Sequence, residues 1–242
     1  MLSHNVLHYT ITSLRITFGY DTVYLSLVRE VRERIKVNEV RVSVAARCRL
    51  TERARYMLIV SLNGLRRGER SLAPVGGGVK VTNAGKRQLI KLFGANSFEK
   101  GNDLRFRLPA GQLDELSDWL EATKELETNA ARREFYDEVV DERHLLTRRL
   151  AQSARFTHRE LREGWMNLWS YPGGRLELTR SYGFEQIYDV WLPNEARQKL
   201  VQAAQQPNPL VEFVSEKEIR SGRSHRHKSN ISPWTKLLLP ER

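Results

Sequence analysis

Hydrophobic residues recur with helical spacing between residues 131 and 150. Ala131, Phe135, Val139, Leu146 and Leu150 follow one another at steps of four and seven, which places them on one face of a helix. No glycine interrupts the pattern, so the helix is expected to continue through Leu150. An acidic ridge is expected on the adjoining face, formed by Glu127, Glu134, Glu138 and Asp141.

Shorter patterns predict the other elements. Residues 56–62 form an apolar run. Strands are expected at 174–181 and 186–192, and residues 211–222 indicate a strand that leads into a short helix. Ser232 and Pro233 are typical of a helix start, so a last helix is expected at 231–239. Between these lie an expected helix at 84–92, a strand at 104–108 and a helix from 110 to 122.

The N-terminal segment is set apart by its own helical stripe. Val23, Leu27, Val28, Val31 and Ile35 share one face of residues 22–37, and charged residues cover the rest. We interpret residues 1–38 as an N-terminal helical extension that packs on the following domain or on a second subunit, as in a homodimer. A helix lying on a membrane surface is the alternative, but the polar face mixes both signs of charge.

Three carboxylates of the predicted central helix can converge on one cation. Glu134, Asp137 and Glu138 stand at positions i, i+3 and i+4, and Mg²⁺ takes oxygen ligands at about 2.0 to 2.1 Å. The alternative is a solvated helix face with ordinary ion pairs, each of which stabilises by roughly 0.2 to 0.5 kcal/mol. Upstream, Gly76 to Gly78 offer a backbone that a substrate can approach closely.

On these residues the chain resembles the Nudix hydrolase superfamily, whose signature is G-x5-E-x7-R-E-U-x-E-E-x-G-U, with U a bulky aliphatic residue. Arg133, Glu134, Phe135, Asp137 and Glu138 stand at the R-E-U-x-E-E positions, and Glu125 precedes Arg133 by eight residues. The signature glycines are matched by Gly77 and Gly78.

The signature is split and altered. Gly78 and Glu125 are separated by 46 residues, so an inserted subdomain is expected at about 81–124, packing over the sheet or covering the site. Asp137 replaces a glutamate, and Val140 and Asp141 replace the terminal glycine and aliphatic residue. A split signature in a long chain resembles the Nudix variant found beside nucleotide second-messenger synthases in bacterial antiphage operons.

The resemblance implies an α/β fold for residues 39–242, a Nudix-type α/β/α sandwich with a mixed sheet. It also implies a pyrophosphohydrolase that cleaves a phosphoanhydride bond in a nucleotide or nucleoside diphosphate derivative. Glu134, Asp137 and Glu138 would hold Mg²⁺ or Mn²⁺, Arg133 would brace the helix, and Gly77 and Gly78 would shape the loop around the phosphates. The candidates for a general base remain open and are Glu127, Glu185 and Glu212.

Charge and composition bound the partners. The net charge of +11 favours polyanions, so nucleotides and RNA are both expected ligands. Two other functions stay open. The altered signature allows a nucleotide sensor without catalysis, and the basic charge allows an enzyme that acts on RNA 5′ ends, such as a decapping enzyme. The single cysteine, Cys48, excludes an intramolecular disulfide framework, and no apolar run reaches about 18 residues, so no membrane span and a cytoplasmic location are expected.

Two basic segments add weaker signals. Residues 219–230 contain four basic side chains and two histidines, and indicate a solvated loop, a phosphate clamp or, least favoured, a metal site. Trp165, Trp169 and Tyr171 lie near several arginines. They predict either core aromatics or a platform for stacking bases.

Overall fold

A computed structural model of the chain describes residues 39–99, 103–170 and 177–240. Apart from Glu39, these residues belong to one compact unit that begins at Val40. The predicted N-terminal extension, residues 1–38, lies outside the described residues. Its helix and its role in a homodimer therefore stay predictions.

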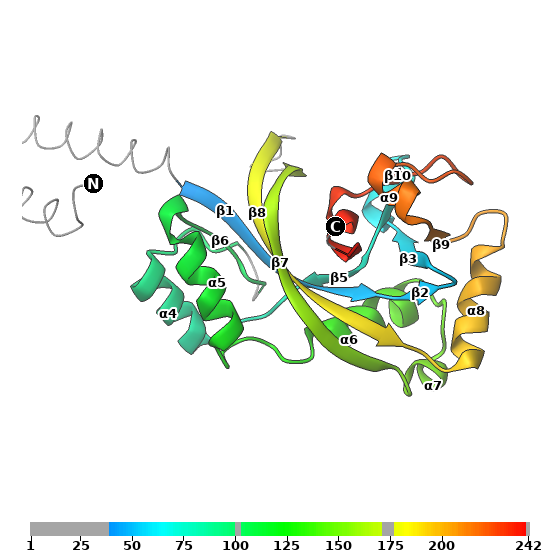
Figure 1. Cartoon of the computed structure of the whole chain (residues 1–242), viewed down its shortest axis with the longest axis horizontal. Helices are drawn as coiled ribbons and strands as arrows, with labels where there is room; N and C mark the ends of the chain where they lie inside the picture. Colours follow the sequence, from blue (N-terminus) through cyan, green and yellow to red (C-terminus); the bar gives the residue numbers. More distant parts are fainter. Residues whose placement is uncertain (1–38, 100–102, 171–176, 241–242) are drawn as a thin grey trace, which may run out of the picture. The chain divides into compact units, whose positions relative to one another are not determined.

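The first of two mixed sheets has the strand order β5-β1-β8-β7, and β6 also pairs with β1. β1 runs parallel to β8 and antiparallel to β5, while β7 and β8 form a long antiparallel pair that curves through the middle of Figure 1. The strands are β1 (Glu39–Arg49), β5 (Val75–Gly78), β6 (Arg105–Pro109), β7 (Arg155–Ser170) and β8 (Glu177–Trp191).

The second sheet has the order β10-β4-β3-β2, and β9 pairs with β3. β10 is parallel to β4, and the other pairs are antiparallel. Its strands are β2 (Thr51–Glu52), β3 (Arg55–Val60), β4 (Ser71–Ala73), β9 (Val211–Val214) and β10 (Asn230–Ile231).

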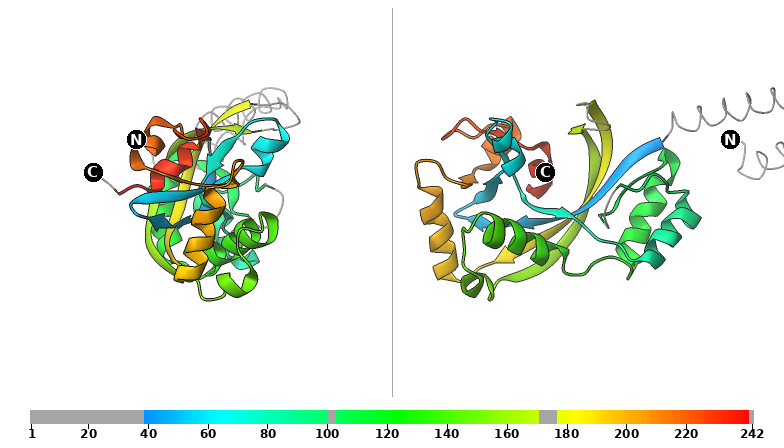
Figure 2. Two further views of the ribbon diagram at one scale, coloured as in Figure 1. Left: turned by 90° about the vertical axis from the view of Figure 1, so that its right-hand side faces the viewer. Right: turned by 180° about the vertical axis from the view of Figure 1, so that it is seen from behind.

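Helices flank both sheets. Figures 1 and 2 show α4 and α5 beside the β1 and β6 end of the first sheet, and α8 beside the second sheet. The α-helices are α3 (Leu62–Arg66), α4 (Asn83–Phe93), α5 (Leu113–Ala122), α6 (Ala130–Phe135), α7 (Arg148–Ala151), α8 (Asn194–Ala204) and α9 (Glu216–Ser221). In the described residues, η2 (Ala110–Gln112) and η5 (Pro233–Leu238) are 3₁₀-helices, and η3 (Tyr136–Glu142) is a π-helix. The predicted α/β class with mixed sheets is confirmed.

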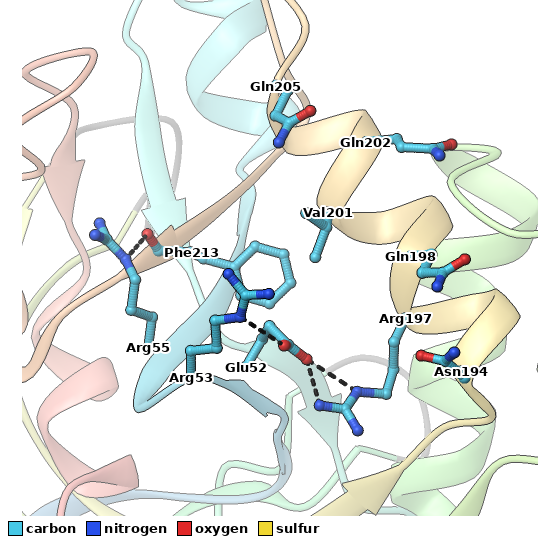
Figure 3. A pocket seen from close by; sticks show the side chains of 10 residues that line it. All are labelled: Glu52, Arg53, Arg55, Asn194, Arg197, Gln198, Val201, Gln202, Gln205 and Phe213. Atoms are coloured by element: carbon cyan, nitrogen blue, oxygen red, sulfur yellow. Dashed lines mark hydrogen bonds and ion pairs between the residues drawn. The ribbon is translucent and has the colours of Figure 1, made fainter.

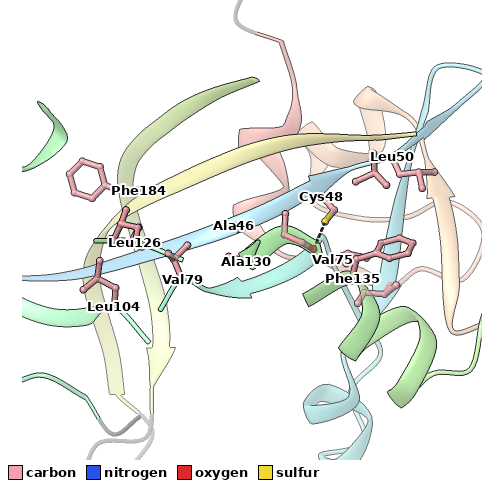
Figure 4. Close-up of a cluster of buried hydrophobic side chains, with 14 of the residues drawn as sticks. Ala46, Cys48, Leu50, Val75, Val79, Leu104, Leu126, Ala130, Phe135 and Phe184 are labelled. Carbon is pink, nitrogen blue, oxygen red and sulfur yellow. Dashed lines mark hydrogen bonds between the residues drawn. The ribbon is translucent and has the colours of Figure 1, made fainter. Parts of the chain in front are cut away.

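The larger hydrophobic core joins the first sheet, the predicted insert and the central helix, which is formed by α6 and η3. Leu89 of α4, Phe106 of β6 and Leu116 of α5 are buried in the same cluster as Val44 of β1 and Phe135 of α6. Figure 4 shows this cluster around Cys48, whose thiol donates to the carbonyl oxygen of Ala131 at 3.4 Å. The insert therefore shares its hydrophobic core with the sheet.

The central helix ends earlier than its apolar pattern predicts. η3 ends at Glu142, and His144 adopts a left-handed φ of 51°, with its Nδ1 atom 3.1 Å from the carbonyl oxygen of Val140. Leu146 is buried beyond this turn, and Leu150 belongs to the separate helix α7. The prediction of a helix through Leu150 was wrong because a histidine takes the left-handed position that glycine usually fills.

The long antiparallel pair of β7 and β8 also differs from the sequence prediction. Residues 155–170 form β7, which the sequence did not indicate, and the predicted strands at 174–181 and 186–192 belong to the single strand β8 as far as the structure describes them. Trp165 of β7 is 45% exposed and packs edge-on against Tyr182, with ring centroids 5.1 Å apart. It is therefore not a core aromatic, while the side chains of Trp169 and Tyr171 lie outside the described residues.

Helix α9 begins with a buried capping carboxylate. Glu218 accepts hydrogen bonds from the amide and hydroxyl of Ser215 and from the His225 amide, each at 2.8 Å, and from Arg55 Nη2 at 3.2 Å. Burial opposes ionisation, but these donors hold the pKa of Glu218 below its usual range. The charged form of this side chain therefore stabilises the fold.

We expect Glu218→Gln to lower the free energy of unfolding at pH 7 by about 1.5 to 3 kcal/mol, since charge-assisted hydrogen bonds are lost. A folded pKa below the unfolded one contributes stability above the unfolded pKa, and this is lost as pH falls through the folded pKa. Urea unfolding of both proteins between pH 7 and pH 3 should show the difference narrow on acidification. A constant difference would contradict this assignment.

Candidate functional site

Strand β5 stands at one end of the strand order of the first sheet and brings glycine backbone against β1. Gly76 pairs with Arg47 and Gly77 with Ala46. Gly76 has a φ of 140°, and a Cβ atom there would lie 2.1 Å from the carbonyl oxygen of Ala46. Only glycine fits this position.

Two carboxylates of the central helix contact β5, which is called the glycine strand below. The amide of Gly76 donates to Glu138 Oε2 at 2.7 Å. A Cβ atom at Gly77 would lie 2.5 Å from the carboxyl carbon of Glu134. The structure thus brings together Gly77, Glu134 and Glu138, three of the residues singled out in the sequence.

Burial makes both carboxylates harder to ionise. It raises the pKa of Glu138 to about 7, opposed by the Gly76 hydrogen bond and by Arg143, and increased further by the charge of Glu134. Burial also raises the pKa of Glu134, and the charges of Asp137 and Asp103 act in the same direction. A bound cation favours the ionised form of such a pair.

Arg133 ties the helix to the glycine strand. Its guanidinium donates to both oxygens of Glu127, at 2.9 and 3.0 Å, to Glu134 Oε1, and to the carbonyl oxygen of Gly78 at 2.8 Å. The hydrogen bonds of Glu127 raise the pKa of Arg133. Burial opposes ionisation of Glu127, but Arg133 holds the pKa of that carboxylate below its usual range.

The carboxylate that precedes the helix differs from the one chosen by spacing. Glu125 accepts from the hydroxyl of Thr82, the N-cap of α4, and is not the partner of Arg133. Glu127 holds that place, two residues later. The split signature explains the difference, because the insert returns to the sheet through the bridge between Val81 and Leu126.

Asp137 has a different setting from the other two carboxylates. Its side chain is 52% exposed, and its Oδ2 lies 3.7 Å from Arg133 Nη1. Asp141, expected on the acidic ridge, is also exposed and pairs with Arg148 at 2.6 Å. The ridge therefore divides into a part that faces β5 and a part that faces solvent.

A second arginine, which the sequence did not reveal, lies on the other side of the glycines. Arg47 donates to Glu185 Oε2 at 2.6 Å and to the carbonyl oxygen of Gly76 at 2.8 Å. Its guanidinium carbon lies 5.9 Å from the ring centroid of Trp234. Trp234 packs on Gly183, where a Cβ atom would lie 2.2 Å from the ring. The register of β1 against β8, which sequence patterns do not give, creates this group.

A small cavity opens beside Glu138. It has a volume of about 220 Å³, and Ser61, Asn63 and Arg66 line it opposite Glu138. Arg143 also lines it and is nearly buried, with Nε and Nη2 bound to the carbonyl oxygen of Val60 at 3.2 and 3.0 Å. Arg143 Nη2 is 3.9 Å from Glu138 Oε1, so the cavity holds both a carboxylate and fixed positive charge.

The three candidates for a general base are all engaged. Glu127 is bound by Arg133, and Glu185 is fully buried against Arg47. Glu212 lies on β9 of the second sheet, bound by Arg70 at 3.0 Å and Ser229 at 3.3 Å. Each of the three carboxylates is therefore paired with an arginine of the protein itself.

The basic segment at 219–230 is bound to the protein itself. Arg226 donates to the carbonyl oxygens of Ala204 and Gln205 at the end of α8, and Arg223 to that of Lys228. Arg220 pairs with Glu216 at 2.7 Å. These contacts support the interpretation as a surface loop. Lys228 and His225 are exposed, whereas His227 is partly buried and its Nε2 atom is enclosed by the protein.

A divalent cation fits the chemistry of the site, although the carboxylates do not surround one point. Within the described ranges, no group of three or more His, Cys, Asp or Glu side chains is arranged to hold a metal ion. Glu134 and Glu138 nevertheless supply oxygen donors, the type that Mg²⁺ and Mn²⁺ take. Their raised pKa values fit a site that gains from added positive charge.

The π-helix lies at the same place. η3 begins at Tyr136, directly after Glu134 and Phe135, and includes Glu138. π-helical turns are rare and occur frequently at functional sites. This turn lets Val139 and Val140 remain buried while Glu138 faces the glycine strand.

A mixed α/β fold with a glycine strand, a bracing arginine and paired glutamates defines a Nudix-type domain. Residues 39–239 match the SMODS-associated NUDIX domain family, and the chain belongs to it. The predicted resemblance to the Nudix superfamily and its antiphage-operon variant is thereby confirmed. No curated protein and no solved structure gives a significant match to the chain. In the part of the chain that the structure describes, no helix has the length and apolar character needed to cross a membrane.

The glycines give a direct test of the close packing. Gly76→Ala should lower the free energy of unfolding by about 1 to 3 kcal/mol, because its φ of 140° is unfavourable for a side chain. Gly111→Ala is the matched control, since a Cβ atom there meets no atom within 4 Å. Thermal and urea unfolding would measure both, and equal stability of the two variants would refute the close contact at Gly76.

Proposed function

We propose that this domain hydrolyses a phosphoanhydride bond in a nucleotide or nucleoside diphosphate derivative, with Mg²⁺ or Mn²⁺. The observation that carries the proposal is the placement of Glu134 and Glu138 on the glycine strand. Membership of the SMODS-associated NUDIX family supports it. The role that follows is a step in bacterial antiphage nucleotide signalling.

Glu134 and Glu138 would hold the cation, and Asp137 would join them by turning from Arg133 or by binding through water. When bound, the ion would neutralise the diphosphate and polarise a water molecule. Gly77 leaves room for Glu134, and Gly78 leaves room for Asp103, since a Cβ atom at either glycine would lie 2.5 Å from that carboxyl carbon. Arg133 fixes the helix against β5 through the carbonyl oxygen of Gly78.

The cavity beside Glu138 gives the substrate phosphates a binding place. Arg66 and Arg143 supply positive charge there, partly offset by Glu142, which accepts from Arg143 at 3.0 Å. Ser61 and Asn63 supply polar groups. Arg143 is held by the carbonyl oxygen of Val60, so its charge is already positioned. On the other side of β5, Glu185 holds Arg47 against the carbonyl oxygen of Gly76.

The positive charge of the whole chain favours anionic substrates in general and does not by itself select one. Free nucleotides, dinucleoside polyphosphates and 5′-triphosphorylated or capped RNA all carry the bond in question. The cavity beside Glu138 would take up phosphates, which free nucleotides and RNA ends share. RNA turnover and binding without turnover are the two outcomes that would redirect the proposal to a 5′-end enzyme or a sensor.

Metal binding is tested without activity. Mg²⁺ should raise the melting temperature of the protein, because a ligand that binds the native state adds RT ln(1 + [L]/Kd). Glu134→Gln together with Glu138→Gln should abolish this rise. Asp141→Asn is the matched control on the same helix, since Asp141 pairs with Arg148 at the solvent side. The site is rejected if the double variant responds to Mg²⁺ as the parent does.

Catalysis is tested by comparing two of the carboxylates, Glu138 and Asp137. Glu138→Gln should lower kcat/KM by about 10²-fold or more, equivalent to roughly 2.7 kcal/mol of transition-state stabilisation. Asp137→Asn should cost less, because Asp137 is half exposed and lies away from the glycines. Chromatography of nucleotides and 5′-modified RNA incubated with Mg²⁺ or Mn²⁺ would identify the substrate. Binding without turnover in every metal would favour the sensor.

A further inference from the structure

A larger groove lies between α8 and the hairpin of β2 and β3, and it shares no residue with the candidate site. It has a volume of about 550 Å³, within the range of ligand pockets. A second cavity of about 370 Å³ shares Arg55, Val201, Gln205 and Phe213 with it. The two therefore border one continuous face of α8.

The groove joins an apolar floor to unbalanced positive charge. In Figure 3 the ring of Phe213, the side chain of Val201 and the guanidinium of Arg53 point into the space between α8 and the hairpin. Glu52 is bound by Arg197 and lies 3.8 Å from Arg53, so one carboxylate faces two arginines. Arg55 adds a third, turned toward Phe213 O and Glu218.

The backbone holds Arg53 in a conformation that is unfavourable for most residues. Arg53 and Ala54 form the two-residue turn between β2 and β3, with φ values of 49° and 58°. Such turns favour asparagine and glycine, because φ is positive at both positions. The side chain of Arg53 is 92% exposed. Residues held in sparsely populated backbone conformations cluster at ligand-binding sites, and Arg53 lies at the edge of this groove.

We propose that this groove binds a nucleotide, separately from the candidate hydrolase site. The base would pack between Phe213 and Val201, the amide of Gln205 would bind its edge, and Arg53 would bind the phosphate. An apolar floor alone would suit a lipid or an apolar peptide, and arginines alone would suit any anion. The combination with a planar aromatic ring and amide groups is what a nucleotide requires.

The same chemistry is offered by a free nucleotide and by one residue of a single-stranded RNA. Isothermal titration of the whole protein in metal-free buffer would use AMP, a five-nucleotide single-stranded RNA and inorganic phosphate. AMP contains no phosphoanhydride bond, so hydrolysis does not disturb the measurement. AMP binding identifies a free-nucleotide site, and binding of the RNA alone identifies a strand site. Either result supports the proposal if the variants Arg53→Asn and Phe213→Leu weaken the observed binding.

Arg53→Asn removes the charge and keeps a residue that tolerates positive φ. It should weaken binding by about tenfold. Phe213→Leu keeps an apolar side chain and removes the aromatic face, and should weaken AMP or RNA binding but not phosphate binding. Arg87→Gln, at an exposed position of α4, changes the net charge equally and should have no effect. Thermal melts would show that all three variants fold.

Four results would overturn the proposal. They are absence of binding to both AMP and RNA, equal weakening by Arg53→Asn and Arg87→Gln, phosphate binding as tight as AMP, and displacement of AMP by an acidic peptide of equal affinity. The first two exclude an anion site in this groove. The last two retain an anion site there but remove the nucleotide as its ligand.

Discussion

The contact between the glycine strand and the central helix is the interaction on which the candidate site depends. Gly76 donates its amide to Glu138, and the missing side chain of Gly77 leaves room for Glu134. Arg133 closes the contact from the other end through Gly78. Two buried carboxylates are held near each other in this way, at a cost to their ionisation that a cation would offset.

The helix chemistry could be predicted from sequence because its residues are local. Phe135 and Val139 repeat at helical spacing and are buried, and Glu134 and Glu138 then fall on the same side. The π-helix and the left-handed His144 were not predictable, since no glycine or proline marks either of them. Local patterns therefore gave the helix and its chemistry but not its end.

The rest of the site required long-range pairing. Arg47 meets Gly76 and Glu185 only because β1 lies between β5 and β8. Glu127 rather than Glu125 reaches Arg133 because the insert ends in a bridge to Val81. β7 escaped prediction since its charged residues, such as Arg159 and Glu160, hide the alternation of a strand. Spacing within one segment carries none of this information.

Strand β3 fixes the distance between the groove of α8 and the cavity at Glu138. Arg55 at its first position borders the groove of α8, and Val60 at its last position holds Arg143 beside the cavity at Glu138. Five steps of about 3.3 Å separate the two residues by roughly 17 Å. Met57 to Val60 are buried, so this strand cannot shorten or bend without disturbing the core. A molecule shorter than that length can contact only one end of the strand, so the groove and the cavity are separate places for a small ligand.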